Sequence, residues 1–168
     1  KVKEYMLDSN FPDRLKFIHV YLSDLNQGFF SKLKKDKSAV LIIDTFNDNS
    51  FAEQRRLFIE LLNNNISNPV IISRFFSKIL NKEQLQISSS IDVGGLFCDG
   101  FGDGIFLCSD SIDNISALNK ISFGILQATR TRISKTEYIS CPSCGRTLFD
   151  LQETTEKIRS VTSHLKGL

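Results

Sequence analysis

The chain has 168 residues, of which 41% are hydrophobic and 24% are charged. This composition is that of a soluble globular protein with one ordinary core, and it excludes disordered and membrane-embedded classes. A net charge of +2 gives no reason to expect a polyanionic partner, and no apolar run approaches the ~20 residues that span a bilayer. We therefore expect neither nucleic acid nor a membrane among its partners.

The first half of the chain predicts two strands separated by a short helix or loop. Residues 1–14 are polar and contain Pro12, so we interpret them as an irregular lead-in. Residues 15–22 (LKFIHVYL) are rich in β-forming side chains and predict a strand, in which His19 is more typical of a packed or edge residue than of a ligand. The basic run 32–35 (KLKK) is typical of a solvated face, and residues 39–44 (AVLIID) predict a strand buried on both faces.

The second half continues the alternation of helix and strand. Residues 50–53 (SFAE) have the pattern of a capping box, which predicts a helix running to the asparagines at 63–65. The expected inner face of that helix consists of Phe51, Leu57, Phe58, Leu61 and Leu62. Further strands are predicted at 69–73 (PVIIS) and 104–108 (GIFLC). The segment 83–98 is ambiguous, because Ile87, Ile91, Gly94 and Cys98 keep helical spacing whereas GLFC alone could be a strand, and we predict a helix. A long helix is expected from Asp110 or Ser111 to about Arg132.

Four successive strand–helix units predict an α/β fold with parallel strands joined by right-handed crossovers. Four units are half of an eight-unit barrel and cannot close by themselves. We therefore expect an open sheet, or pairing with a partner such as a second copy, to cover the edges. The glycine-rich segment 99–104 (DGFGDG) is more typical of a helix end and tight turn than of a phosphate site, because two of its residues are acidic.

Cys141 and Cys144 form a C-x-x-C motif, which is the only place where two soft ligands have metal-binding spacing. Pro142 and Gly145 favour a preformed loop around the thiols. Zinc and a typical iron–sulfur cluster each need four ligands, so the motif is half of a site and leaves zinc, cluster and redox chemistry open. A redox pair would stand at a helix start, but the next predicted helix is capped by Asp150 and lies further along the chain.

Residues 136–152 (TEYISCPSCGRTLFDLQ) resemble the start of the iron–sulfur domain of hydroxymethylbutenyl diphosphate synthase. The segments DGFGDGIFL and ILQATRTR resemble its long form, which carries an extra domain between the catalytic barrel and the cluster domain. The resemblance covers residues 90–168 specifically and the rest loosely. It implies that residues 1–134 are half of a barrel-like insert domain and that 135–168 begin a truncated iron–sulfur domain.

This family resemblance also implies an activity. The enzymes are iron–sulfur oxidoreductases that convert 2-C-methyl-D-erythritol 2,4-cyclodiphosphate to 4-hydroxy-3-methylbut-2-enyl diphosphate in non-mevalonate isoprenoid biosynthesis. Cys141 and Cys144 would be two ligands of a 4Fe-4S cluster whose other ligands lie beyond Leu168, and ferredoxin or flavodoxin would donate electrons. No catalytic residue is expected within this piece, which should be inactive alone, with the insert acting as a structural spacer. The alternative is a zinc-binding interaction module without catalysis.

The other cysteines and the cations around the motif complete the candidate residues. Cys98 and Cys108 end apolar stretches and are expected to be buried free thiols. The chain's four cysteines are too few for a disulfide scaffold, so we expect a reducing compartment, either the bacterial cytoplasm or the plastid stroma. The cations that flank the motif are Arg130, Arg132, Lys135 and Arg146. One interpretation is functional: these cations would raise the potential of a cluster, or would contact the diphosphate or an electron donor. The other is structural: they form the cationic end that the dipole of a helix favours.

Overall fold

The computed structural model describes residues 1–7, 14–77, 81–110, 114–139 and 148–165. Its strands form one parallel sheet in the order β1 (Lys16–Val20), β2 (Ala39–Ile43), β3 (Val70–Phe76) and β4 (Gly104–Ser109). Each strand is followed by helical structure before the next strand begins, so the predicted α/β fold of four parallel strand–helix units is confirmed.

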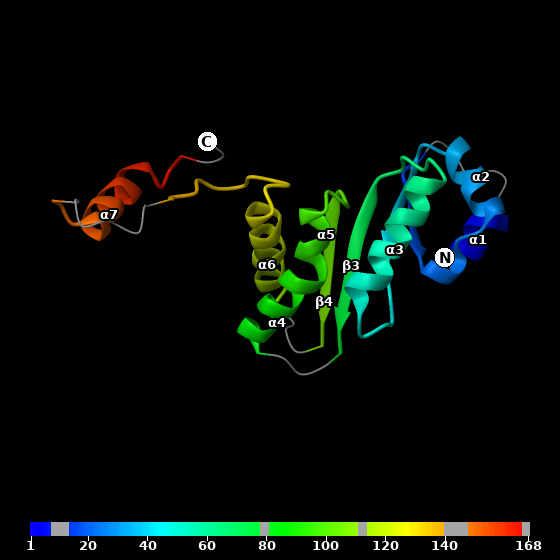
Figure 1. Ribbon diagram of the computed structural model, residues 1–168, viewed down its shortest axis with the longest axis horizontal. Helices are drawn as coiled ribbons and strands as arrows, with labels where there is room; N and C mark the ends of the chain where they lie inside the picture. The colour runs from blue at the N-terminus through cyan, green and yellow to red at the C-terminus, as the bar shows by residue number, and fades with distance from the viewer. Residues whose placement is uncertain (8–13, 78–80, 111–113, 140–147, 166–168) are drawn as a thin grey trace.

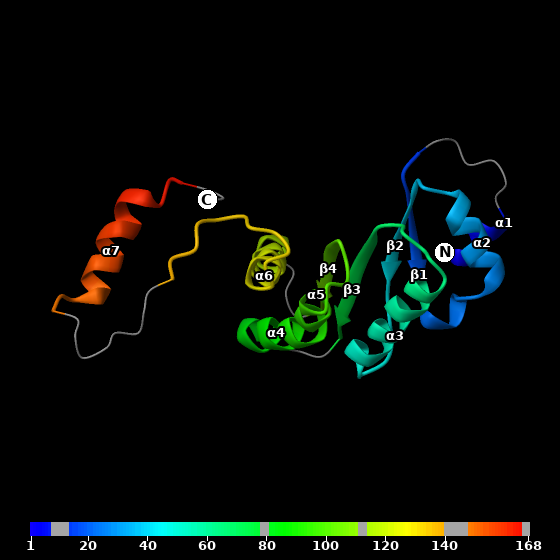
Figure 2. The same ribbon diagram turned by 45° about the horizontal axis from the view of Figure 1, so that its top comes forward.

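The helices follow the expected alternation (Figures 1 and 2). They are α1 (Val2–Leu7), a 3₁₀ turn η1 (Leu22–Asp24), α2 (Gln27–Lys35), α3 (Ser50–Asn63), α4 (Lys82–Ser89), a π-helical turn η2 (Ser90–Gly94), α5 (Gly95–Cys98), α6 (Ile115–Ala128) and α7 (Leu151–Thr162). Figure 1 shows α7 set apart from the sheet and the other helices, beyond α6. No described helix combines the length and the apolar character needed to cross a membrane.

The core lies on one face of the sheet. Leu41, Ile43 and Ile72 are completely buried, and they share a face because side chains alternate along a strand and partners in register point the same way. On the opposite face, Phe17 and Phe106 remain about half exposed. The helices therefore cover one face of the sheet and leave the other open.

Residues 2–7 form the helix α1, so the expectation of an irregular lead-in over residues 1–14 was wrong there, and residues 8–13 lie outside the described part of the chain. Val2 and Tyr5 of α1 are buried, and the Tyr5 ring meets Phe29 of α2 edge-on with 6.1 Å between ring centroids. The Tyr5 hydroxyl also donates a hydrogen bond to Asp36 across 3.0 Å. This short helix is held by contacts with residues far along the chain, which local sequence does not reveal.

Two helix starts differ from their predictions. The cap of α3 is Asn49, whose side chain accepts a hydrogen bond from the Ala52 amide, whereas Ser50 is completely buried inside the first turn. Glu53 does not close a capping box and accepts a hydrogen bond from the Thr45 hydroxyl instead. Similarly, α6 begins at Ile115, later than expected, after its cap residue Asn114.

The segment 82–98 is helical as predicted, but it presents a different face to the core. Leu85 and Ser89 of α4, Val93 of the π turn η2 and Leu96 of α5 are completely buried, and their regular helical spacing makes them the inner face. Ile87 and Ile91, which kept regular helical spacing in the sequence, are 55% and 64% exposed.

Candidate functional site

The cysteine loop falls in residues 140–147, outside the described part of the chain. Cys141, Cys144 and Arg146 all belong to it, so their roles stay predictions. The described residues on either side nevertheless define how the chain enters and leaves the loop.

The chain reaches the loop through a linker that α6 holds in place. Gln127, a buried residue near the end of α6, accepts hydrogen bonds from the amides of Ser134 (3.0 Å) and Lys135 (3.2 Å). The Gln127 side-chain amide also donates to the Lys135 carbonyl across 2.8 Å. Because one side chain satisfies three backbone groups, it fixes the direction in which the chain leaves α6. This role was not predicted, since a glutamine near a helix end carries no distinctive sequence pattern.

Beyond the loop, α7 runs back along the segment that enters it. The α7 cap is Asp150, as predicted, and its carboxylate accepts hydrogen bonds from the two amides at 152 and 153. The Tyr138 hydroxyl lies 2.8 Å from the Thr162 hydroxyl, and the Arg159 guanidinium lies 5.3 Å from the centre of the Tyr138 ring. The Thr136 hydroxyl donates to the carbonyl of residue 165 across 2.6 Å. These contacts join the two flanks of the cysteine loop.

Two of the described cations near the loop, Arg130 and Arg132, have local partners. Arg130 forms an ion pair with Glu137 at 2.7 Å, although both side chains are more than a third exposed, so the pair contributes little stability. The Arg132 guanidinium lies 5.6 Å from the centre of the Phe123 ring. Both contacts favour a structural role at the end of α6.

A cavity of about 550 Å³ lies at the carboxyl ends of β2 and β3, where barrel enzymes place ligands. It is lined by Asp44, Asp92 and Arg74 among others. The Arg74 guanidinium is already paired with Asp92 at 2.9 Å and donates to the Asn47 carbonyl. The acidic surplus disfavours a phosphate, and the described residues hold no cluster of three or more His, Cys, Asp or Glu that could bind a metal.

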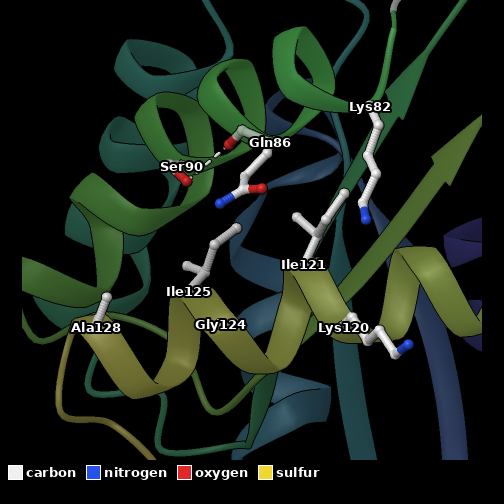
Figure 3. Close-up of a pocket in the computed structure, with 8 residues that line it drawn as sticks. All are labelled: Lys82, Gln86, Ser90, Lys120, Ile121, Gly124, Ile125 and Ala128. Carbon is white, nitrogen blue, oxygen red and sulfur yellow. Dashed lines mark hydrogen bonds between the residues drawn. The ribbon is translucent and has the colours of Figure 1, made fainter. Parts of the chain in front are cut away.

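Figure 3 shows a second hollow, of about 230 Å³, between α4–η2 and α6. Ile121 and Ile125 of α6 face Gln86 and Ser90 across it, and the exposed Lys120 lies near one end. The Ser90 hydroxyl donates to the Gln86 carbonyl across 2.7 Å, as the dashed line marks. The hollow is a gap between packed helices, and its lining residues do not form a recognisable catalytic or ligand-binding group.

The remaining cysteines and the glycine turn have structural surroundings. Cys98 is exposed, so the expectation that it is buried was wrong, whereas Cys108 is partly buried. Burial raises the pKa of the Cys108 thiol, and the nearby Asp44 carboxylate raises it further, which makes the thiol a poor nucleophile. In the glycine turn, the Asp103 carboxylate accepts a hydrogen bond from the Val70 amide at 2.8 Å, so the turn serves to join strands.

Comparison with known proteins decides which family the chain belongs to. The chain is 47% identical, over 154 residues and 92% of its length, to 4-hydroxy-3-methylbut-2-en-1-yl diphosphate synthase (flavodoxin) of Parabacteroides distasonis. This chain belongs, as a segment, to the 4-hydroxy-3-methylbut-2-en-1-yl diphosphate synthase family. It spans about a quarter of that relative's length, since the match covers 25% of it.

Two other synthases of the same name are also similar to this chain. The Leptospira interrogans enzyme is 52% identical over 104 residues, covering 58% of this chain and 16% of the relative. The chloroplastic rice synthase, whose name specifies ferredoxin, is 48% identical over 114 residues, or 68% of this chain and 15% of the relative. No family model and no solved structure matches the chain. The synthase family expected from the cysteine motif and its surroundings is therefore confirmed.

Proposed function

We propose that the chain supplies two cluster ligands, Cys141 and Cys144, and an adjoining spacer to a synthase that makes 4-hydroxy-3-methylbut-2-enyl diphosphate from the cyclic diphosphate of methylerythritol. The observation that carries the proposal is a C-x-x-C motif within a chain related over 92% of its length to such a synthase. Flavodoxin is the proposed electron donor, because the name of the Parabacteroides relative specifies it.

The two cysteine thiols are ligands of the type that the proposed iron–sulfur cluster requires. Thiolates are the usual ligands of a 4Fe-4S cluster, and two residues between them let both sulfurs face one centre. When bound, the cluster would supply electrons and Lewis acidity for reductive opening of the cyclic diphosphate. The two thiols are half of a ligand set, and we propose that residues outside this chain supply the remaining ligands.

The rest of the chain would position the thiols. Gln127 fixes the linker that leads from α6, and Tyr138 connects the incoming segment to α7. The four-stranded body then acts as a spacer that sets the distance between the cluster loop and whatever polypeptide holds the substrate. We propose residues 1–134 as this spacer and 135–168 as the first part of the cluster domain.

The cluster assignment is tested in a chimera in which this chain replaces the aligned segment of the Parabacteroides synthase. Cys141→Ser and Cys144→Ser should each abolish the visible absorption and bound iron of the purified anaerobic protein. Cys98→Ser is the matched control, because Cys98 is an exposed thiol elsewhere in the fold and its loss should leave iron unchanged. Stoichiometric zinc held by Cys141 and Cys144 would instead support the interaction-module alternative and contradict the proposal.

The spacer role is tested separately in the same chimera. Deleting residues 1–132 should leave iron content and absorption intact while removing turnover, since the cluster would no longer reach the substrate. A deletion variant that still turns over would refute the spacer role without affecting the cluster assignment.

A further inference from the structure

Gln127 joins the end of α6 to the segment that leads toward the cysteine motif. Its side chain is only 5% exposed, and the linker engages both of its polar atoms. The oxygen accepts hydrogen bonds from the amides of Ser134 and Lys135 and from the Ser134 hydroxyl, the last at 3.3 Å, while the nitrogen donates to the Lys135 carbonyl. Since a buried amide without partners is costly, these bonds hold the linker in one position on α6.

The turn between α6 and this linker is also fixed. Arg130 has a φ of +61°, a left-handed conformation that residues with a side chain rarely adopt. Its amide donates to the Gln127 carbonyl across 3.1 Å, and the Arg132 amide donates to the Leu126 carbonyl across 3.1 Å. Residues other than glycine keep this conformation where the surrounding structure imposes it, and such positions are frequent at functional sites. The turn and the linker therefore form one rigid support at the end of α6.

Residues 136–138 continue from this support and are joined to α7. The Thr136 hydroxyl donates to the carbonyl of residue 165, and the Tyr138 hydroxyl lies 2.8 Å from the hydroxyl of Thr162. Between them, the Glu137 carboxylate forms its ion pair with Arg130 of the turn. The described residues on both sides of the cysteine motif are therefore connected to the four-stranded body through the backbone that Gln127 holds.

From these contacts we propose that Gln127 is a positioning residue of the synthase. It fixes where the cluster domain begins on the four-stranded body, and thereby the placement of the Cys141 and Cys144 thiols relative to the substrate. This role rests on the proposed function, which assigns the two thiols to the cluster. Gln127 acts through the backbone at 134–135, so its loss should leave the ligands in the chain and change their placement. A misplacement of about 1 Å can lower a rate by about 100-fold.

The proposal is tested with Gln127→Met in the chimera described above, because methionine has a similar length and lacks the amide. Bound iron and visible absorption should equal those of the unsubstituted chimera. The kcat per bound iron should fall at least about 10-fold, with the KM for the cyclic diphosphate unchanged. Gln54→Met is the matched control: Gln54 is also a buried glutamine, and its amide donates to the carbonyls of Ile43 and Ser73 within the sheet. Its loss should lower the melting temperature and leave kcat per bound iron unchanged.

Amide exchange in the chain without metal gives a readout that is independent of turnover. The amides of Ser134 and Lys135 should exchange at least about 10-fold faster in Gln127→Met than in the wild type or Gln54→Met. If Gln127→Met loses its native circular dichroism, Ser134→Pro takes its place, because it removes one amide donor to Gln127 at an exposed position.

The outcomes separate this role from the proposed function. An unsubstituted chimera that binds no iron contradicts the proposed function and the positioning role with it. If that chimera binds iron, a Gln127→Met variant with unchanged kcat per bound iron overturns the positioning role alone. An equal loss of kcat in Gln54→Met, or a loss of iron in Gln127→Met alone, overturns it as well, since general stability or cluster assembly would then be the cause.

Discussion

Gly102 occupies a position in the turn before β4 that only a residue without a side chain fills comfortably. Its φ is +89°, and a Cβ built on it would lie 2.7 Å from the Cδ1 atom of Ile72, a fully buried core residue. Phe101 beside it stacks on Phe58 of α3 with ring centroids 4.9 Å apart. The turn is therefore packed between the sheet and α3 at Gly102, whereas Gly100, with a φ of +81° and nothing near its missing side chain, is favoured by its backbone conformation alone.

Replacing Gly102 with alanine should lower the free energy of unfolding by about 1–3 kcal/mol, because the backbone conformation and the contact with Ile72 are both unfavourable for a side chain. Urea denaturation followed by circular dichroism measures the change. Gly124→Ala is the control: it lies inside α6, its Cβ would meet nothing within 4 Å, and helix propensity predicts a gain of up to about 1 kcal/mol. Equal effects of the two substitutions would contradict the packing argument.

Among single residues, those of the glycine turn could be predicted from the sequence, but the burial of each cysteine could not. The spacing of glycines and acids in residues 99–104 predicted a tight turn because positive φ angles favour glycine. Cys98, in contrast, ends α5 after the buried residues Leu96 and Phe97, and the helix geometry turns it toward solvent. An apolar neighbourhood in sequence does not determine which side of a helix the last residue occupies.

Asp36 links three elements at the amino end of the sheet. Its carboxylate accepts hydrogen bonds from Lys16 of β1 at 2.7 Å, from the Tyr5 hydroxyl of α1 at 3.0 Å, and from the Ser38 hydroxyl at 2.6 Å. Burial raises the pKa of Asp36, but these hydrogen bonds outweigh it and lower the pKa from 3.8 to about 2. Burial raises the pKa of Tyr5, and the hydrogen bond to Asp36 raises it further.

The Asp36 network should make stability depend on pH. Because the folded pKa lies below the unfolded value, its contribution is complete above about pH 4 and is lost as pH falls toward 2. Asp36→Asn should therefore cost on the order of 2 kcal/mol at pH 7, with the difference from wild type shrinking toward zero in acid. Urea titrations between pH 7 and 2 measure this, and Asp48→Asn, in an exposed loop, is the control. A penalty that does not change with pH would exclude the charge as its origin.

The bounds of a helix or strand could be predicted from the sequence only where a single sequence pattern indicated them. The apolar runs gave all four strands, because continuous hydrophobic segments between polar turns suit a covered parallel sheet. The α3 cap was assigned one residue late, since Asn49 and Ser50 are both good caps and only tertiary burial of Ser50 decides between them. The inner face of the segment 82–98 was assigned wrongly for a related reason, because Ile87 and Ile91 have the same helical spacing as the buried residues Leu85, Ser89 and Val93.

The arrangement of the whole molecule divides into a packed body and a peripheral helix. Alternating strands and helices predicted the parallel sheet and its open edges, because each crossover returns the chain to the same side. The position of α7 was not predictable from its own sequence. None of the residues of α7 is buried, and apolar side chains such as Ile158 and Val161 stay 52% and 69% exposed. An amphipathic stripe indicates that a helix has a packing face but does not identify what packs on it.

This division predicts that the body folds without the tail. A chain ending at Lys135 keeps the backbone that Gln127 holds. It loses the contacts that join α7 to Thr136 and Tyr138, and the exposed ion pair between Arg130 and Glu137, which contributes little stability. Its melting temperature, followed by circular dichroism, should stay within about 3 °C of the full chain, because little buried apolar area is removed. A chain ending at Gly124 is the contrasting control, since it also removes the buried Ile125 and should melt far lower or fail to fold. A large loss from the first truncation would mean that α7 belongs to the core and that the proposed boundary between spacer and cluster domain lies elsewhere.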